Sequence, residues 1–529
     1  MPKWIVVTGG VLSGLGKGVA SASIGKLLNT QKIVPIKCDG YLNVDPGTMN
    51  PIEHGEVFVL EDGGEVDMDF GHYERFLGVM CKSEWNLTMG KVFHKIREKE
   101  RRGDYLGKTV QFIPHVTQLI KDWWREIAQK EEADVMLVEI GGTVGDIENE
   151  LYIEAARQLQ HEEERKDSLF IHLTYVPTPK GTKEQKSKPT QQSVNLLLQK
   201  GIQPDIVIGR CREDLDESVK EKIALFSNLN KDAVISGMDM EDIYEVPVTF
   251  YEQGILDNIN KKLKTNYSAD LVDWKKLVQQ RKEPTQDICI AICGKYTRLE
   301  DSYASIVEAL NHCSAHFKTR ISLKWIETSK EEDIDSVLND VDAVIIPGGF
   351  GKRGIEGKIA VARFCRMHKI PLLGICLGLQ VMVVEYARNV CGLDDANSTE
   401  FNETKHPVVD ILPEQLSVKN KGGTMRLGAY ETELVVGSQM ATSIYRSDKA
   451  SERHRHRFEV NPEFHRAFEG KDLVFSGTSQ NGRLVEFIEL KGHPYYVGTQ
   501  GHPELKSSLL RPAPLFCGLI KATLEKKAL

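Results

Sequence analysis

The stretch Trp4–Gly18, WIVVTGGVLSGLGKG, joins an apolar, β-branched run to a glycine-rich turn that contains a lysine. This order is typical of a buried strand that passes through a loop into a helix, which we expect to begin at Val19. Glycines let backbone N–H groups close around phosphate oxygens, and the helix N-terminus adds a favourable dipole. The stretch therefore predicts a phosphate-binding loop, in which Lys17 reaches the terminal phosphates as a point charge.

The loop departs from the common GxxxxGK[ST] pattern, because Gly18 replaces the Ser or Thr that usually touches magnesium. Metal ligands must then come from elsewhere. Glu139 ends the apolar run Val135–Val138, where the acid of a Walker-B-like strand stands, and Asp69 is a second candidate. Magnesium needs only one or two carboxylates. The alternative is a glycine-rich turn without a ligand, accompanied by acids that only cap helices or face solvent.

The rest of the chain alternates short β-branched runs with helical stretches, which predicts parallel sheets with crossover helices. A polar passage over 266–286 has little core-forming content and is expected to be a linker. We therefore expect an α/β fold with two doubly wound domains, 1–265 and 287–529. The expected strands are Trp4–Thr8, Val135–Glu139, Leu169–Tyr175 and Ile206–Ile208 in the first domain, and Ile288–Cys293, Val344–Ile346 and Leu372–Ile375 in the second.

In the second domain, LLGICLGLQ (372–380) is an apolar strand followed by G-x-C-x-G and a helix. This is the cysteine form of the nucleophile elbow, a sharp turn that exposes its central side chain. The helix N-terminus favours the thiolate of Cys376, and the N–H of Leu377 can donate to an oxyanion. The glycine-rich loop Gly348–Gly351 can supply a second donor.

A thiol nucleophile needs a base, and HPE late in the domain supplies one. His502 would take the proton of Cys376, while Glu504 would orient the imidazole and support its charged form. A lone buried cysteine is ordinarily an inert core residue, but an elbow with a downstream HPE favours catalysis.

Composition narrows the function classes. Of the 529 residues, 41% are hydrophobic and 27% charged, with a net charge of −8, which argues against a broad nucleic-acid or membrane surface. No apolar run approaches a membrane span. The ten cysteines form no CxxC pair, so a zinc ribbon or disulfide framework is not expected, and a reducing cytoplasm fits best.

Several strings make the sequence resemble the CTP synthases over nearly its whole length. In the first half they are GGVLSGLGKG, EHGEVFVLEDGGEVD, HYERF, KERRGDYLGKTVQ, EIGGTVGDIE and KSKPTQ, and in the second GGFGKRG, LGICLG, ANSTEF, GGTMRLG and ERHRHRFEVN. The resemblance implies a P-loop-type amidoligase domain fused to a class I glutamine amidotransferase domain. It implies ATP-dependent amination of UTP to CTP, through a phosphorylated UTP, with ammonia released from glutamine.

The resemblance also implies roles for individual residues, the catalytic ones being Cys376, His502 and Glu504. ATP would contact Gly14, Leu15, Gly16, Lys17, Gly18, Val19, Asp69, Met238, Asp239 and Met240. Mg²⁺ would be held by Asp69 and Glu139. UTP, and CTP as feedback inhibitor, would contact Ser13, Lys37, Asp146, Ile147, Glu148, Lys186, Ser187, Lys188, Pro189, Thr190, Gln191 and Lys222. Glutamine would contact Gly349, Leu377, Gly378, Leu379, Gln380, Glu400 and Arg457, and Arg426 would lie where GTP activates the glutaminase.

By the same resemblance we expect a cytoplasmic homotetramer that can form filaments, with no nucleic-acid or membrane partner. Two departures from the family pattern are Gly40, expected to loosen the backbone past Lys37, and Gly501, expected to leave a gap beside His502 where relatives carry an aromatic ring. Two alternatives stay open. One is another P-loop amidoligase fused to a glutaminase, such as a cobyrinic acid amidase, and the other is a catalytically weak regulatory homologue.

Overall fold

The computed structural model describes residues 2–49, 55–164, 166–182, 184–295, 300–329, 334–412, 415 and 423–529. The chain forms two compact units: Met1–Pro46 with Asp69–Lys275, and Gly47–Met68 with Lys276–Leu529. The segment Gly47–Met68 thus packs with the second unit. The domain boundaries at 265 and 287 stay predictions.

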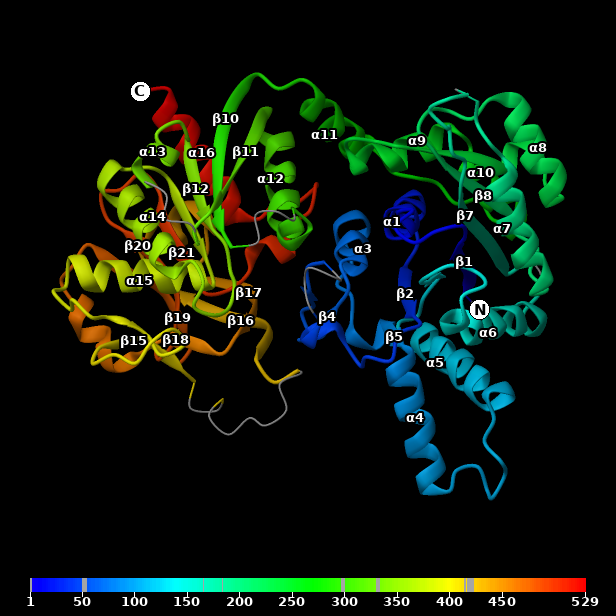
Figure 1. Ribbon diagram of the computed structural model, residues 1–529, viewed down its shortest axis with the longest axis horizontal. Coiled ribbons are helices and arrows are strands. Elements are labelled where there is room, and N and C mark those ends of the chain that lie inside the picture. Colours follow the sequence, from blue (N-terminus) through cyan, green and yellow to red (C-terminus); the bar gives the residue numbers. More distant parts are fainter. Residues whose placement is uncertain are drawn as a thin grey trace. The chain divides into compact units, whose positions relative to one another are not determined.

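The first unit is built on a parallel sheet, as the alternation of apolar runs predicts (Figure 1). Every predicted strand of this unit is present. In sheet order the strands are β5 (Asn86–Thr88), β2 (Ile33–Asp39), β6 (Val135–Ile140), β1 (Lys3–Gly9), β7 (Ser168–Tyr175), β8 (Ile206–Cys211) and β9 (Val234–Met238). Because parallel strands end at one edge, the loops after β1, β2, β6, β7 and β9 are brought together there.

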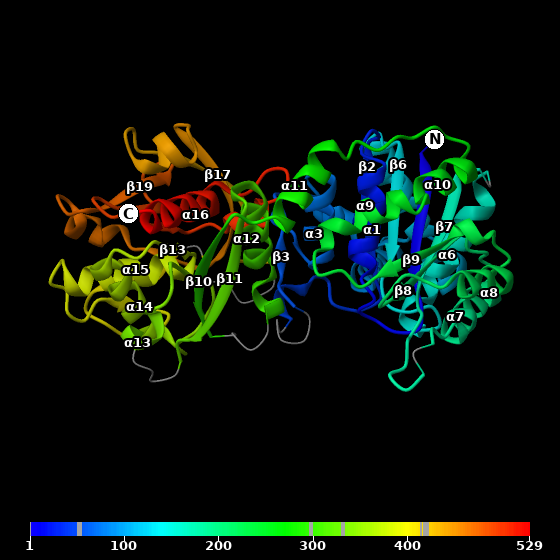
Figure 2. The same cartoon turned by 90° about the horizontal axis from the view of Figure 1, so that it is seen from above.

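Helices cover both faces of this sheet (Figure 2). One group contains α1 (Lys17–Leu27), α3 (Asp69–Leu77), α9 (Val246–Glu252) and α10 (Ile255–Leu263). The other contains α4 (Met89–Arg102), α5 (Thr117–Lys130), α6 (Glu150–Glu162), α7 (Lys188–Gln199) and α8 (Glu217–Ser227). The predicted linker contains α11 (Val272–Lys282), whose Trp274 is buried and donates from Nε1 to the Tyr244 carbonyl at 2.8 Å.

The second unit has a mixed sheet whose parallel part includes all the strands expected from its sequence (Figure 1). The order is β11 (Thr319–Glu327), β10 (Gln286–Gly294), β12 (Ala343–Ile346), β13 (Leu372–Ile375), β21 (Tyr496–Thr499), β20 (Val485–Leu490), β19 (Leu473–Ser479), β16 (Arg426–Leu434) and β17 (Lys449–His456). A smaller sheet joins β14 (Asn397–Ser398), β15 (Pro407–Ile411) and β18 (Phe458–Val460).

Alternate side chains of the central strands build two cores, one on each face of this sheet. Val344 and Ile346 of β12 pack with α14 (Ile355–His368) and α15 (Leu377–Asn389). Ala343 and Ile345 pack with α12 (Ala304–Phe317) and α16 (Pro514–Lys527). A short helix, α13 (Ile334–Leu338), contacts α14. In both halves of the chain, helices therefore cover both faces of a central sheet, which confirms the predicted α/β fold.

The segment 47–68 adds a hairpin, β3 (Phe58–Val59) with β4 (Glu65–Val66), to the second unit. The fully buried Arg453 holds it, donating to the Val59 carbonyl and to the Glu61 carboxylate, both at 3.0 Å. The backbone N–H of Ala429 donates to the Glu61 carbonyl at 3.0 Å. A buried, multiply bonded arginine fixes this hairpin where it is.

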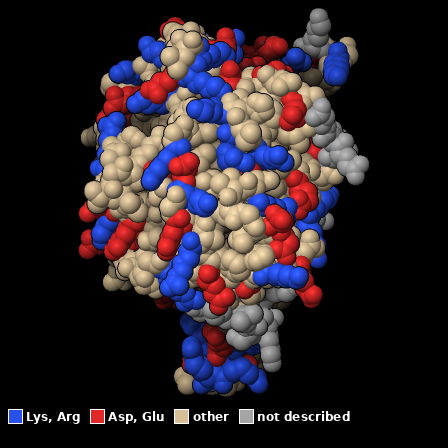
Figure 3. Space-filling view, turned by 90° about the vertical axis from the view of Figure 1, so that its left-hand side faces the viewer, with Lys and Arg blue, Asp and Glu red and all other residues tan. Residues whose placement is uncertain are grey.

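The surface agrees with the mixed composition of the chain. On the face drawn in Figure 3, Lys and Arg are interspersed with Asp and Glu among neutral side chains. Among the described residues, none of the helices combines the length and apolarity needed to cross a bilayer.

Candidate functional site

The phosphate-binding loop follows β1, and its backbone has the left-handed conformation that glycine favours. Gly14 has φ 76° and Gly16 φ 85°, and Gly16 is the residue before α1. The helix begins at Lys17, two residues before the predicted start at Val19. The first N–H groups of α1 therefore point toward the loop, where they have no intrahelical acceptor and can bind an anion.

Lys17 folds back over the loop. Its Nζ donates to the Gly142 carbonyl at 2.7 Å, which links the loop after β1 with the loop after β6. Burial lowers the pKa of Lys17, and the nearby Glu139 carboxylate opposes that shift. A β-carbon at Gly9 would lie 2.7 Å from the Lys17 Nζ, so glycine there leaves room for the lysine stem.

The two predicted metal ligands converge on one cation, the ammonium group of Lys37. Its Nζ contacts Asp69 directly and lies 3.1 Å from Glu139 Oε1. The Tyr73 hydroxyl donates to Glu139 Oε2 at 2.7 Å and so orients that carboxylate. Although burial opposes it, the Lys37 charge lowers the pKa of Asp69.

This donor set fits magnesium. Two buried or half-buried carboxylates that share a cation supply the hard oxygen ligands that Mg²⁺ takes in proteins. In the part of the chain that the structure describes, no group of three His, Cys, Asp or Glu side chains is arranged to hold a metal ion. An ion at Asp69 and Glu139 would therefore need phosphate and water oxygens to complete its shell.

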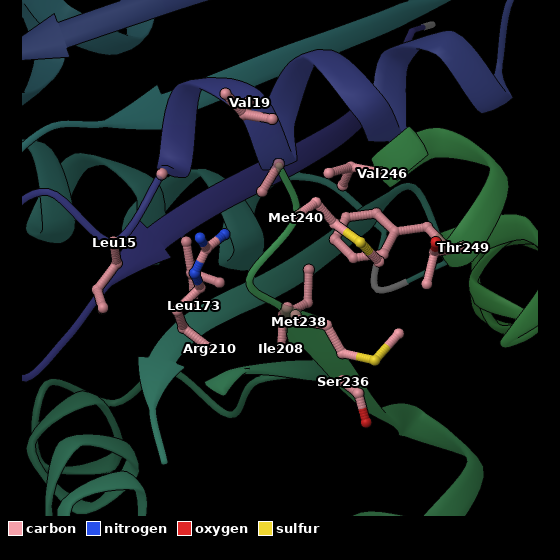
Figure 4. A pocket seen from close by; sticks show the side chains of 14 residues that line it. Leu15, Val19, Leu173, Ile208, Arg210, Ser236, Met238, Met240, Val246 and Thr249 are labelled. Carbon is pink, nitrogen blue, oxygen red and sulfur yellow. The ribbon is translucent and has the colours of Figure 1, made fainter. Parts of the chain in front are cut away.

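A pocket beside the phosphate loop holds two of the three residues predicted to contact the ATP base (Figure 4). Met238 and Met240 line it, whereas Asp239 does not and instead pairs with Arg210 Nε at 2.7 Å. Residues that the sequence did not indicate complete the lining: Ala20, Leu173, Ile208, Arg210, Ser236, Gly237, Val246, Thr249 and Phe250. Apart from Ala20, these residues lie on strands β7, β8 and β9 or on helix α9, which only the tertiary fold brings next to the phosphate loop, so no local pattern could have indicated them.

The residues predicted for UTP lie in the same unit, most of them in loops that follow strands. Ser13 lies in the phosphate loop, Lys37 on β2, Asp146 to Glu148 after β6, Lys186 to Gln191 at the start of α7, and Lys222 at an exposed position of α8. Asp146 accepts from the Thr143 N–H at 3.1 Å, and Ser187 accepts from Gln191 Nε2 at 3.0 Å. The loops after β6 and β7 flank β1, so both border the phosphate loop. Their contacts with a nucleotide stay predictions.

Gly40 lies against the loop that follows β6. A β-carbon there would lie 2.7 Å from the Glu148 Cβ and 2.9 Å from its carbonyl oxygen. Glycine therefore permits a close approach to the loop after β6, and the loosening of the backbone past Lys37 stays a prediction.

In the second unit, Cys376 joins β13 to α15 with φ 53° and ψ −104°, a strained conformation for a residue other than glycine. Its backbone N–H donates to the Thr499 carbonyl at 2.7 Å, which anchors the turn to β21. Leu377 and Gly378 open α15, where the first N–H groups lack intrahelical acceptors. This is the elbow geometry that the sequence predicts.

His502 and Glu504 lie beside the elbow, and His502 Nδ1 is 2.7 Å from Glu504 Oε1. Burial lowers the pKa of His502, but the Glu504 carboxylate and the Cys376 sulfur outweigh it and raise the pKa to about 10. The imidazolium is thus favoured next to the thiol. Charge on the imidazole stabilises a thiolate, as nucleophilic catalysis requires.

The triad opens into a cavity of about 570 Å³. Gly348, Gly349 and Phe350 line one side, and Arg457 lines another. Of the other residues predicted to bind glutamine, Leu377, Gly378, Leu379 and Gln380 form the first turn of α15. The sequence did not indicate that Gly47, Thr48, Met49, Glu56 and Val57, far away along the chain, also line it.

Side chains from three places hold the glycine-rich loop next to the triad. Buried Lys358 donates to the Pro347 carbonyl at 3.1 Å, Lys295 donates to the Phe350 carbonyl, and Glu400 accepts from the Gly351 N–H at 2.6 Å. A β-carbon at Gly348 would lie 3.0 Å from His502 Cε1, so only glycine brings the backbone this close. The loop is positioned to offer N–H groups near the sulfur.

Arg426, predicted to respond to GTP, is nearly buried. Its guanidinium binds Glu459 at 2.8 Å and Glu486 at 2.6 Å, and it stacks on Tyr430. Its neighbour Met425, rather than Arg426 itself, lines the cavity. The role in GTP activation stays a prediction.

Gly501 does not leave a gap. A β-carbon there would lie 2.7 Å from the Glu452 Cβ, 3.2 Å from the Arg453 carbonyl oxygen and 3.3 Å from His454 Nε2. The expectation of missing packing beside His502 was wrong. Strand β17 fills the space in which the sequence suggested a void.

Comparisons with known proteins agree with this geometry. Residues 3–265 match the family model described as CTP synthase N-terminus, and residues 298–522 match glutamine amidotransferase class-I. The chain is 52% identical to a CTP synthase of Methanopyrus kandleri, over 98% of each chain. It is 51% identical to one of Pyrococcus furiosus, over 100% of this chain and 99% of the relative. It is 49% identical to one of Archaeoglobus fulgidus, over 99% of this chain and 98% of the relative.

Proposed function

Because the chain belongs to the CTP synthase family, it is a glutamine-hydrolysing ligase of pyrimidine nucleotide synthesis, and we propose that its two units divide the reaction. The second unit releases ammonia from glutamine, and the first phosphorylates UTP with ATP and lets ammonia displace the phosphate. The observation that carries the division is the separate geometry of the two sites: a thiol–imidazole–carboxylate triad in one unit and a lysine-bearing phosphate loop in the other.

In glutamine hydrolysis, the Cys376 sulfur attacks the amide carbon of glutamine while His502 holds the thiol proton. His502 returns that proton to the leaving ammonia, and water then cleaves the thioester to give glutamate. The Leu377 N–H and the loop at Gly349 stabilise the oxyanion of each step. Support comes from the elbow dihedrals and from the Glu504 carboxylate 2.7 Å from the imidazole.

In the synthetase reaction, the 4-oxygen of UTP attacks the γ-phosphorus of ATP and ADP leaves. Ammonia then adds at C4 and phosphate departs. Lys17 and Lys37 position and neutralise the phosphates, which is most of what phosphoryl transfer asks of a protein. Mg²⁺ held by Asp69 and Glu139 would supply further neutralisation of charge. The adenine ring is expected in the pocket of Met238 and Met240.

The finer properties that the family implies are proposals for this chain. They are GTP activation of the glutaminase, CTP feedback at the UTP site, a homotetramer able to form filaments, and a cytoplasmic location. The UTP-site strings, such as KSKPTQ, disfavour another fused amidoligase, and intact triad residues disfavour an inactive homologue. To distinguish these two alternatives from a CTP synthase, turnover of UTP with ATP and magnesium is compared with turnover of the substrates of other amidoligases.

Two substitutions test the division of labour. Cys376→Ala is expected to abolish CTP formation from glutamine and to leave ammonium-dependent synthesis intact. Lys17→Ala is expected to abolish synthesis from either nitrogen source, while glutamine hydrolysis persists. Cys391→Ala, a thiol away from the triad, serves as the control for loss of a cysteine. Loss of both activities in folded Cys376→Ala would contradict the proposal.

A further inference from the structure

Gln500 directly follows β21 and stands two residues before the base, with its side chain fully buried. Its Nε2 lies 3.6 Å from the sulfur of Cys376. We propose that Gln500 is a catalytic residue of glutamine hydrolysis, whose side-chain amide donates a hydrogen bond to Cys376 Sγ and stabilises the thiolate. This role rests on the function of Cys376 proposed above and adds a residue that neither the sequence pattern nor the triad identifies.

The direction of this hydrogen bond follows from its neighbours. Gln380 Nε2 donates to the Phe458 carbonyl at 3.0 Å, and since a carbonyl only accepts, the nitrogen of Gln380 must face that way. The same nitrogen lies 3.3 Å from Gln500 Oε1 and donates to it. The oxygen of Gln500 is therefore committed to Gln380, and its N–H groups are left to face the sulfur. A flipped amide would set two donors against each other.

The backbone holds this arrangement rigid. The Gln500 N–H donates to the Glu486 carbonyl at 2.8 Å, and the preceding carbonyl, of Thr499, accepts from the Cys376 N–H at 2.7 Å. Adjacent residues of one strand end thus fix both the backbone and the side chain of the nucleophile. The N–H···S contact does not depend on a mobile loop.

A donor is needed at this place for a physical reason. Cys376 is only 3% exposed, so few water molecules reach its thiolate, and a largely buried anion with too few donors is strongly disfavoured. His502 supplies the countercharge, but it must also carry the proton that it takes. An amide N–H is neutral and does not compete for that proton. Gln500 therefore can lower the cost of the thiolate throughout the reaction.

Two variants of the full-length chain separate this role from simple packing. Gln500→Met keeps length and removes the donor, whereas Gln500→Glu keeps shape and turns an acceptor toward the sulfur. The probe is iodoacetamide, with alkylation of Cys376 followed by peptide mass spectrometry across pH, because the chain has ten cysteines. Glutamine-dependent and ammonium-dependent synthesis are measured alongside. The control is Gln480→Met, at an exposed glutamine of the same unit.

We expect Gln500→Met to shift the alkylation profile upward by about one pH unit and to lower glutamine-dependent kcat/KM by about 10- to 100-fold. Gln500→Glu is expected to shift the alkylation profile further toward high pH. At low pH the new carboxyl protonates and can donate to the sulfur, so part of the lost reactivity of Cys376 should return. Ammonium-dependent synthesis and the control stay at the wild-type level. An unchanged alkylation profile in either folded variant overturns the role of Gln500, whereas glutamine-dependent synthesis in Cys376→Ala would overturn the function of Cys376 itself.

Discussion

The carboxylate of Asp69 occupies the space that a side chain at Gly18 would need. A β-carbon built on Gly18 overlaps Asp69 Oδ1 and lies 2.8 Å from its Cγ. Position 18 is where phosphate loops usually carry the hydroxyl that touches magnesium. In this chain the carboxylate from α3 stands in that place, so the missing hydroxyl and the acid are two parts of one arrangement.

Gly18→Ala tests this relationship. We expect the methyl group to displace Asp69 and to lower CTP synthesis from either nitrogen source by at least about 100-fold, because misplacement by an ångström has that effect on phosphoryl transfer. Glutamine hydrolysis should persist. Gly181→Ala is the matched control, since nothing lies within 4 Å of a β-carbon there. Normal synthesis in Gly18→Ala would show that Asp69 is not needed where it lies.

The pocket of Met238 and Met240 gives a second prediction. Ala20 lines this pocket from α1, and Ala20→Leu should fill part of it. We expect KM for ATP to rise about tenfold, while KM for UTP and glutamine hydrolysis change little. Steady-state kinetics with each substrate varied in turn measure this. An equal rise in both KM values would place the adenine ring elsewhere.

Gly501 gives a third prediction. Because strand β17 already fills the space, Gly501→Phe should displace Glu452 and His502 and lower glutamine-dependent turnover by about 10- to 100-fold. Gly501→Ala should lower glutamine-dependent turnover less than Gly501→Phe does. Ammonium-dependent turnover should be unchanged in both variants. A gain in glutamine-dependent turnover with phenylalanine would mean that the site tolerates a ring.

The ion pair of His502 and Glu504 makes stability depend on pH. The folded-state pKa of His502, about 10, lies above the ordinary 6.5, so its charge stabilises the fold fully below pH 6.5 and this contribution is lost as pH rises toward 10. In Glu504→Gln the contribution should largely vanish. The difference in urea midpoint between wild type and variant should therefore shrink from pH 6.5 to 10. Glu403→Gln, at an exposed carboxylate, should show no such trend.

The sequence by itself determined the parts of this protein that short strings encode. The run into GGVLSGLGKG, the elbow around Cys376 and the HPE at His502 each combine a strand, a turn and a helix start in consecutive residues. Backbone sterics and hydrogen bonding dictate such units locally, so the central strands, the phosphate loop and the triad were predictable. The resemblance to a known family then added the expected substrate, which these local units do not indicate by themselves.

Tertiary structure alone decided the contacts between residues distant in the chain. Asp69 beside Gly18, Glu148 beside Gly40 and Glu452 beside Gly501 are close approaches between separate elements. No local pattern reveals how near two backbones come, and the gap expected at Gly501 was therefore wrong. Gln500 contacts Cys376 for the same reason: adjacent parallel strands β13 and β21 bring their ends together in register, and the sheet sets that spacing.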